Sequence, residues 1–132
     1  MKLQIVHRAS GDKSRAKKLD SYEIESLIAP AEEAAATVYR VRIAPHKKTS
    51  VSYHKIAEEI YFVITGNGTA ILDGTARKIS VGDLLRLPPG TTHGFVTTDE
   101  PLDMLNFHTP GCRPDHDVYF TDGPAPDGFM KG

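Results

Sequence analysis

Three side chains of the kind that bind divalent metals stand in two short stretches of the sequence. His54 and Glu59 are separated by four residues at the start of an apolar segment, and His93 follows a Pro-Pro-Gly turn signal. Because successive strand residues alternate between two faces, Ser52 should share a face with His54, and Tyr61 with Glu59. Two imidazoles and one carboxylate on facing strands are typical of an iron(II) site with open positions, and zinc, manganese or nickel are also reasonable. We therefore predict a divalent-metal site formed by His54, Glu59 and His93.

The pocket around this site should be walled by residues on the same strands. We expect Ser52, Tyr61, Phe95 and Thr97 there, and core packing is the alternative for Tyr61 and Phe95. A metal-free pocket in which the polar residues merely satisfy one another also remains open at this point.

Two further histidines have candidate roles near the site, whereas Glu58 does not. His108 ends the segment LDMLNFH and is a candidate ligand or general acid/base group, because imidazole titrates near neutral pH. His46 follows Pro45 in a loop and is a candidate substitute ligand. Glu58 should point away from Glu59 and into solvent.

The elements that would position these residues are short strands divided by turn signals, which indicates an all-β sandwich or barrel. Asn67-Gly68 and Asp73-Gly74 are dipeptides typical of tight hairpin turns. An early strand is expected over 22–28. The run Lys13 to Lys18 is expected to be a solvated loop, and the Pro- and Gly-rich tail from Pro110 to Gly132 to be irregular. The remaining predicted strands cover 37–44, 51–54, 59–65, 69–73, 76–80, 84–87, 92–97 and 102–108.

Two spaced motifs connect these observations to a known family. His54, Glu59 and Gly66 follow H-x4-E-x6-G, and VGDLLRLPPGTTHGFV contains G-x5-P-x-G-x2-H, ending at His93. The pair resembles the two signature motifs of the cupin superfamily. The resemblance implies a double-stranded β-helix, or jelly-roll barrel. It also implies that His54, Glu59 and His93 bind a divalent metal.

The sequence departs from the family pattern at three positions. Ser52 replaces the first metal histidine, His46 replaces the opening glycine of the first motif, and Thr97 replaces the closing asparagine of the second. The loss at Ser52 removes one protein ligand. Residues 107–111 and Asp122-Gly123 also resemble the C-terminal part of ectoine synthase, itself a small cupin. We do not adopt that assignment, because Thr-Pro-Gly after the last strand occurs in other cupins.

Composition bounds the remaining expectations. The 132 residues predict one domain, with a barrel core at about 38–108 and with segments 1–36 and 110–132 packed outside it. A net charge of −1 argues against a nucleic-acid partner. The N-terminal stretch lacks a secretory apolar region, and no apolar run approaches the ~18 residues of a membrane span. We expect a cytoplasmic homodimer in which the single cysteine, Cys112, is a free thiol.

Two functional interpretations follow. In the first, the protein is a metal-dependent enzyme acting on a small oxygen-rich molecule, of the dioxygenase, isomerase, cyclase or lyase type that the resemblance implies. In the second, it is a non-catalytic cupin that binds a small molecule in a metal-free pocket. The fold alone does not choose between these interpretations, because one fold hosts many chemistries.

Overall fold

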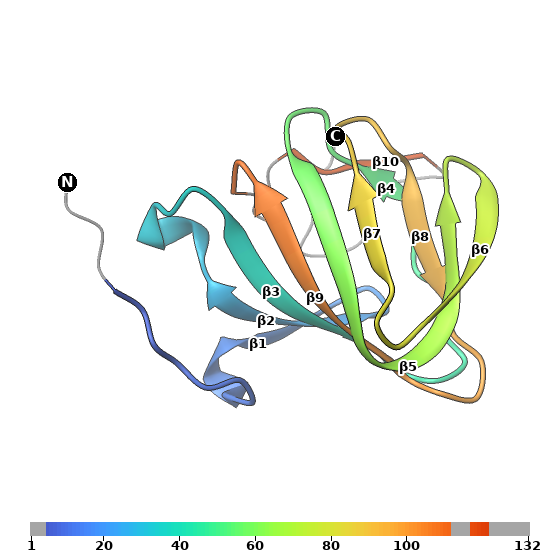
Figure 1. The fold of residues 1–132 in the computed structure, drawn as a ribbon, viewed down its shortest axis with the longest axis horizontal. Helices are drawn as coiled ribbons and strands as arrows, with labels where there is room; N and C mark the ends of the chain where they lie inside the picture. The colour runs from blue at the N-terminus through green and yellow to red at the C-terminus, as the bar shows by residue number, and fades with distance from the viewer. Residues whose placement is uncertain (1–4, 112–116, 122–132) are drawn as a thin grey trace.

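The computed structural model describes residues 5–111 and 117–121, and strands dominate them (Figure 1). Within this part of the chain no helix is long and apolar enough to cross a lipid bilayer. The only helical pieces among residues 5–111 and 117–121 are the 3-10 turns η1 (Lys13–Arg15) and η2 (Pro30–Glu32). The strands are β1 (Ala16–Leu19), β2 (Tyr22–Ile28), β3 (Thr37–Ile43), β4 (Ser52–Tyr53), β5 (Glu58–Leu72), β6 (Thr75–Ser80), β7 (Leu84–Leu87), β8 (His93–Val96), β9 (Leu102–Thr109) and β10 (Tyr119–Phe120).

The strands form one curled antiparallel sheet whose two halves meet at β5, so the jelly-roll prediction is confirmed (Figure 1). In one half the strands follow the order β1, β2, β3, β9, β5 and β7. In the other half the order is β10, β4, β8, β5 and β6. The curl turns one face of both halves inward, and this is the face that carries the predicted ligands.

The prediction of a hairpin at Asn67-Gly68 is wrong. Both residues lie inside β5, where Asn67 pairs with Ser80 and Gly68 with Ile79. The bend falls at Gly66 instead, where φ is +85° and β5 changes partners from one half of the sheet to the other. A Cβ at Gly66 would lie 1.8 Å from the Pro101 carbonyl oxygen, so only glycine fits there.

The prediction of a hairpin at Asp73-Gly74 is confirmed. Leu72 of β5 pairs with Thr75 of β6, which leaves a two-residue loop. Asp73 and Gly74 have φ values of +48° and +81°, the left-handed conformation that such a loop requires. The two predicted strands 59–65 and 69–73 are therefore one strand, followed by the hairpin.

Two strands are absent from the sequence prediction. Residues 16–19 form β1, although the lysine run was expected to be a solvated loop. The sequence misled here because all side chains of β1 except Leu19 are exposed, as they would be in a loop. In the tail, Tyr119 and Phe120 form β10 by pairing with Tyr53 and Ser52 of β4. Residues 112–116, which include Cys112, and residues 122–132 lie outside the described residues.

Strand β3 shows how the sequence selects the inner face. Tyr39, Val41 and Ile43 are buried, whereas Arg40 and Arg42 between them are partly or fully exposed, as the alternation predicts. Burial of an apolar side chain of this size contributes roughly 1.5–3 kcal/mol. The same inner face of the other strands completes the core, with Tyr61, Val63, Ala70, Ile79, Leu87, Phe95, Leu102 and Met104.

Candidate metal centre

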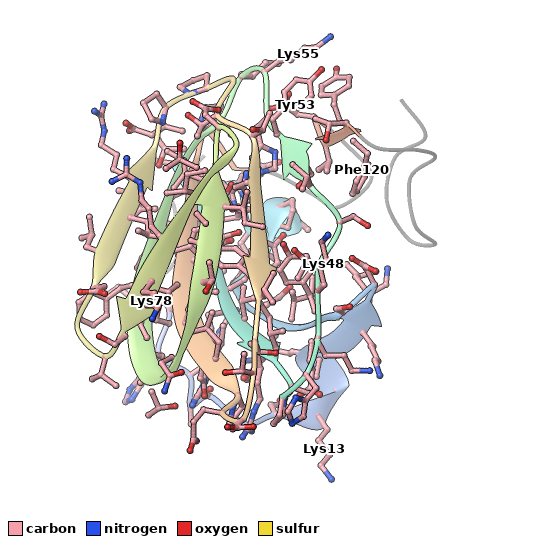
Figure 2. All side chains as sticks on the ribbon, turned by 90° about the vertical axis from the view of Figure 1, so that its right-hand side faces the viewer. Lys13, Lys48, Tyr53, Lys55, Lys78 and Phe120 are labelled. Carbon is pink, nitrogen blue, oxygen red and sulfur yellow. The ribbon has the colours of Figure 1, made fainter. Side chains whose placement is uncertain are left out.

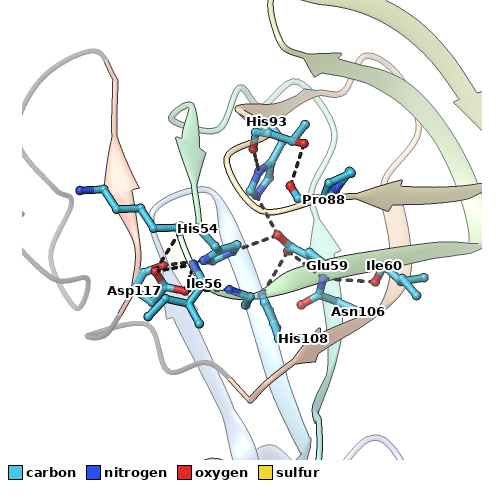
Figure 3. A network of polar contacts seen from close by, with 12 residues as sticks. His54, Ile56, Glu59, Ile60, Pro88, His93, Asn106, His108 and Asp117 are labelled. Atoms are coloured by element: carbon cyan, nitrogen blue, oxygen red, sulfur yellow. Dashed lines mark hydrogen bonds and ion pairs between the residues drawn. The ribbon is translucent and has the colours of Figure 1, made fainter.

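Four polar side chains from four segments meet inside the barrel (Figure 3). His54 follows β4, Glu59 lies near the start of β5, His93 begins β8 and His108 lies near the end of β9. Strand register brings them together, because Glu59 pairs with His108 and Ser52 pairs with His93. All four side chains are buried.

The three imidazoles surround the carboxylate of Glu59. Nε2 of His54 and Nε2 of His93 lie 2.9 and 3.3 Å from Oε2 of Glu59. Nε2 of His108 lies 3.2 Å from Oε1 of the same carboxylate. The ligand atoms of His54, Glu59 and His108 all lie within 4.8 Å of one another, a group that does not include His93. The structure therefore brings together the three predicted ligands and adds His108.

The contacts of Nδ1 in His54 and His93 determine which ring nitrogen carries the hydrogen when the ring is neutral. Nδ1 of His54 lies 2.7 Å from the backbone oxygen of Asp117, and Nδ1 of His93 lies 3.3 Å from that of Thr91. A carbonyl oxygen only accepts hydrogen bonds, so the ring hydrogen belongs on Nδ1 in both residues. When neutral, each ring then presents the Nε2 lone pair toward Glu59, which is the arrangement that metal-binding histidines adopt.

Glu59 has one satisfied oxygen and one unsatisfied oxygen. Oε1 accepts a hydrogen bond of 2.9 Å from Nδ2 of Asn106, whereas Oε2 is fully buried with no hydrogen-bond partner among the described residues. Burial alone would raise the pKa of Glu59, but the neighbouring His93 and His108 hold it well below its ordinary value. A carboxylate with a buried, unsatisfied oxygen facing two imidazole nitrogens fits a cation, and an isolated buried charge would otherwise be costly.

The surroundings of His93 favour its neutral form. Burial is the main cause that lowers the pKa of His93, and the negative charge of Glu59 only partly opposes it. Neutral imidazole and ionised carboxylate are the protonation states that metal coordination requires.

A segment near the C-terminus supports His54 from behind. We call residues 117–121 the C-terminal strap. The Asp117 carboxylate accepts hydrogen bonds from the backbone N–H groups of residues 55–57, at 2.9 Å from Lys55, 3.1 Å from Ile56 and 3.0 Å from Ala57. The strap thus holds both the loop after His54 and, through its backbone oxygen, the ring of His54 itself (Figure 3).

Aromatic contacts fasten the strap at the same end of the barrel. The ring of Tyr119 stacks on Tyr53 with centroids 5.4 Å apart, and Nζ of Lys55 lies 4.1 Å from the Tyr119 centroid. Figure 2 shows Tyr53, Lys55 and Phe120 gathered at one end of the molecule, opposite Lys13. The strap is therefore part of the wall beside the candidate metal centre.

A cavity of about 80 Å³ opens beside these residues. Ser52 and Tyr61 line it, as the sequence predicts, together with Glu59 and the three histidines around it. Phe95 and Thr97, expected in the same wall, lie outside this lining. Phe95 is a fully buried core residue that packs edge-on against Tyr61, and the Thr97 hydroxyl donates to the Ala44 carbonyl at 2.6 Å.

Two further candidates lie away from the cavity. His46 is exposed in its loop, where its Nε2 lies 3.7 Å from Oδ1 of Asp99, so it is no substitute ligand in this structure. Glu58 points to the other face from Glu59, as expected, where it pairs with Arg86.

The comparison with known families agrees with this geometry. A family model described as a cupin domain matches residues 39–108, which is more than half of the chain and includes Glu59, His93 and His108. The chain belongs to the cupin family.

Two curated proteins match part of the chain. The uncharacterized protein MJ1618 of Methanocaldococcus jannaschii is 37% identical over 59 residues, covering 44% of this chain and 47% of that protein. A 5-aminosalicylate 1,2-dioxygenase of Comamonas sp. is 29% identical over 73 residues, covering 48% of this chain and 20% of that enzyme. The match thus spans less than half of either relative.

Solved structures extend the likeness to nearly the whole chain. Ectoine synthase from P. lautus superposes with a TM-score of 0.74, covering 95% of each chain at 16% sequence identity. At this identity the likeness shows a shared fold, and the assignment of function stays with the site.

Proposed function

We propose that this protein is a metal-dependent enzyme that binds a divalent metal through His54, Glu59 and His93 and acts on a small molecule in the adjacent cavity. The observation that carries the proposal is the unsatisfied Oε2 of Glu59, which faces Nε2 of His54 and of His93. Their Nδ1 atoms are engaged by backbone oxygens, so both lone pairs are directed to the same place. Imidazole and carboxylate donors suit iron, manganese, zinc or nickel.

His108 supplies a fourth donor in this proposal. Its Nε2 approaches Oε1 of Glu59 at 3.2 Å, and its ligand atom lies within 4.8 Å of those of His54 and Glu59. The family pattern has a histidine where this chain has Ser52, and His108 reaches the same carboxylate from β9. An acid/base role is the alternative for His108, because its Nδ1 is buried without a hydrogen-bond partner among the described residues.

The bound metal would polarise an oxygen of the substrate or activate water. The chain's own residues orient the donors: Asn106 holds Glu59, and the backbone oxygens of Thr91 and Asp117 hold His93 and His54. A dioxygenase and a synthase among the similar proteins support an enzymatic role, with dioxygenase, isomerase, cyclase and lyase reactions all within reach.

Calorimetric titration of metal-stripped protein with Mn²⁺ and Zn²⁺ tests the proposal. We expect one metal per chain, and we expect His93→Ala and His108→Ala each to weaken binding by at least about tenfold. Retained affinity in His93→Ala would remove that residue from the site. Retained affinity in His108→Ala would leave the acid/base role for it. Absence of metal binding by the wild-type protein would refute the proposal.

The second interpretation is a small-molecule binding protein without metal. It would be favoured if a cavity ligand bound equally well before and after chelation with EDTA. The homodimer and the cytoplasmic location stay predictions, and sedimentation at micromolar concentration tests the first of them.

A further inference from the structure

The cavity beside the metal centre has two chemically different ends. Toward β4, β5, β8 and β9 its lining is mostly polar, with the three histidines, Glu59, Ser52 and Asn106, and the strap adds the apolar Val118. Toward β1, β2 and β3 the lining is apolar, and its members are Leu19, Tyr22, Ile24 and Val41. Tyr39 and Tyr61 lie between the two sets, since Tyr39 pairs with Asn106 and Tyr61 packs against His93.

Strand register shows that the apolar set leads away from Glu59. On β3, Tyr39 lies beside Asn106, and Val41 lies two residues farther along, beside Met104. On β2, Ile24 pairs with Val41, so it extends the apolar surface one strand outward. An occupant of the cavity therefore meets polar groups at one edge and hydrocarbon or aromatic surface beyond it.

The apolar end offers few hydrogen-bonding groups. The Tyr22 hydroxyl, the polar atom of that end, lies 3.1 Å from Oγ1 of Thr49 and is held within the wall. Among the described lining residues, Glu59 is the only carboxylate, and none is a lysine or arginine. A sugar carries hydroxyl groups around its whole ring and would leave many of them unpaired at this end, which is costly on burial.

The inner part of the cavity has the size of a single ring. A cavity of about 80 Å³ holds on the order of five to eight water-sized groups. That matches one substituted six-membered ring, and a larger ligand would extend out of the open side of the cavity. The tyrosine side chains of the wall provide the faces and edges against which an aromatic ring packs well.

We infer that the ligand is a small aromatic ring whose oxygen donors lie on one edge, such as an aromatic carboxylate or a phenol. The oxygen edge lies against the metal centre, and the ring lies between Tyr39, Ile24 and Val41. The position of the oxygen edge rests on the proposed function, that is, on a metal at Glu59. The position of the ring rests on the apolar lining alone. The inference narrows the oxygen-rich substrate expected from the sequence to one whose oxygens are confined to one side.

Three simple carboxylates test the inference by calorimetry on Mn²⁺-loaded protein. Benzoate carries a ring and one carboxylate, acetate carries the carboxylate alone, and D-glucuronate carries it on a sugar ring. We expect benzoate to bind at least about tenfold more tightly than either of the others, because only its ring buries apolar surface at the far end. Equal affinity for acetate or D-glucuronate, or no binding of benzoate at millimolar concentration, would overturn the inference.

A pair of variants on β2 locates the ring. Ile24→Asn places an amide at the apolar end, and Glu23→Asn places the same amide on the exposed opposite face of the strand. We expect Ile24→Asn to reduce the preference for benzoate over acetate by about tenfold, and Glu23→Asn to leave it unchanged. A thermal melt checks that both variants fold. If Ile24→Asn does not fold, the comparison of benzoate, acetate and D-glucuronate on the wild-type protein still tests the inference.

Metal titration of the same preparation separates this inference from the proposed function. If the protein binds no Mn²⁺ but still prefers benzoate, the metal-dependent function fails and the ring site stands. If it binds Mn²⁺ and shows no preference for benzoate, the ring inference fails and the metal centre stands.

Discussion

Two buried glutamates of this barrel, Glu25 and Glu59, differ in how their carboxylate oxygens are hydrogen-bonded. Glu25 on β2 accepts hydrogen bonds from the hydroxyl of Ser10 and from the backbone N–H groups of Gly11 and Asp12, which satisfy both of its oxygens. Glu59 on β5 accepts a hydrogen bond from Asn106 at Oε1, whereas its Oε2 accepts none from the described residues and faces two imidazole nitrogens.

The pKa of each carboxyl lies below its ordinary value, for different reasons. Burial opposes ionisation of both. For Glu25 the lowering comes from the hydrogen bonds of Gly11, Ser10 and Asp12, and from the charge of Arg40. For Glu59 it comes chiefly from His93 and His108, which are themselves buried. A carboxylate saturated by the backbone holds a chain segment in place, whereas one left unsaturated among imidazoles is available to a metal.

Substitution of Glu59 should have the largest effect. Glu59→Gln removes the only charged donor, and we expect metal affinity to fall by more than about 100-fold, because even residues that merely orient ligands are worth 10- to 100-fold. The fold should persist, because Gln keeps the shape and the hydrogen bond from Asn106. Calorimetric metal titration and a thermal melt measure the two effects. The same change at Glu25 is the matched control, and equal loss of metal affinity in both variants would contradict the comparison.

Asp117 is a saturated carboxylate that acts on the site from outside. Asp117→Asn keeps the left-handed backbone, with φ of +57°, but loses the charge that binds the loop after His54. We expect metal affinity to fall by about tenfold, with a change in the ¹⁵N shifts of the His54 ring as the loop loosens.

A matched control for this effect lies elsewhere in the chain. Asp20 also has a left-handed backbone, with φ of +55°, and its carboxylate accepts a hydrogen bond from the backbone N–H of Ser50. Asp20→Asn should leave metal affinity unchanged. A loss equal to that of Asp117→Asn would show that the strap has no specific role.

Local patterns in the sequence predict most of the candidate ligands, but not the strap that holds the loop after His54. Spacing predicts His54, Glu59 and His93, and strand parity places Asn106 on the same face as His108. Nothing local predicts Asp117, because its contacts with residues 55–57 join segments about 60 residues apart and depend on the path of the strap.

The same distinction explains the outcome for the fold. Alternation in β3 and the Asp73-Gly74 turn are local signals, and both predictions are confirmed. Asn67-Gly68 carries an equally strong local signal for a hairpin, but β6 pairs with β5 from Asn67 onward, β8 pairs with it from Thr69 onward, and this pairing keeps the segment extended. Tertiary pairing overrides turn propensity where a strand passes from one half of a barrel to the other.

Ser52 offers a gain of function that sharpens the comparison. Its side chain lines the cavity, and the residue pairs with His93, so Ser52→His adds an imidazole next to the unsaturated carboxylate. We expect metal binding to tighten by up to about tenfold, since imidazole is a far better ligand than a hydroxyl. If His108 is the fourth donor, Ser52→His should also restore affinity to His108→Ala. Calorimetry of the two single variants and the double variant measures this, and failure to rescue would show that an imidazole at position 52 does not reach the metal.

The smallest effect is expected at Glu25, and it concerns stability alone. Glu25→Gln should lower the free energy of unfolding by about 1–2 kcal/mol at neutral pH, because it loses charge-assisted hydrogen bonds to segment 10–12. The depressed pKa of Glu25 means that this stabilisation is present above the unfolded pKa of about 4.3 and is lost as the pH falls through the lower folded pKa. Urea unfolding at neutral and acidic pH should therefore show a gap between wild type and variant that closes in acid, with metal affinity unchanged. Glu23→Gln, exposed on the same strand, should show no gap at either pH. A gap that stays constant with pH would mean that the charge of Glu25 is not what holds segment 10–12.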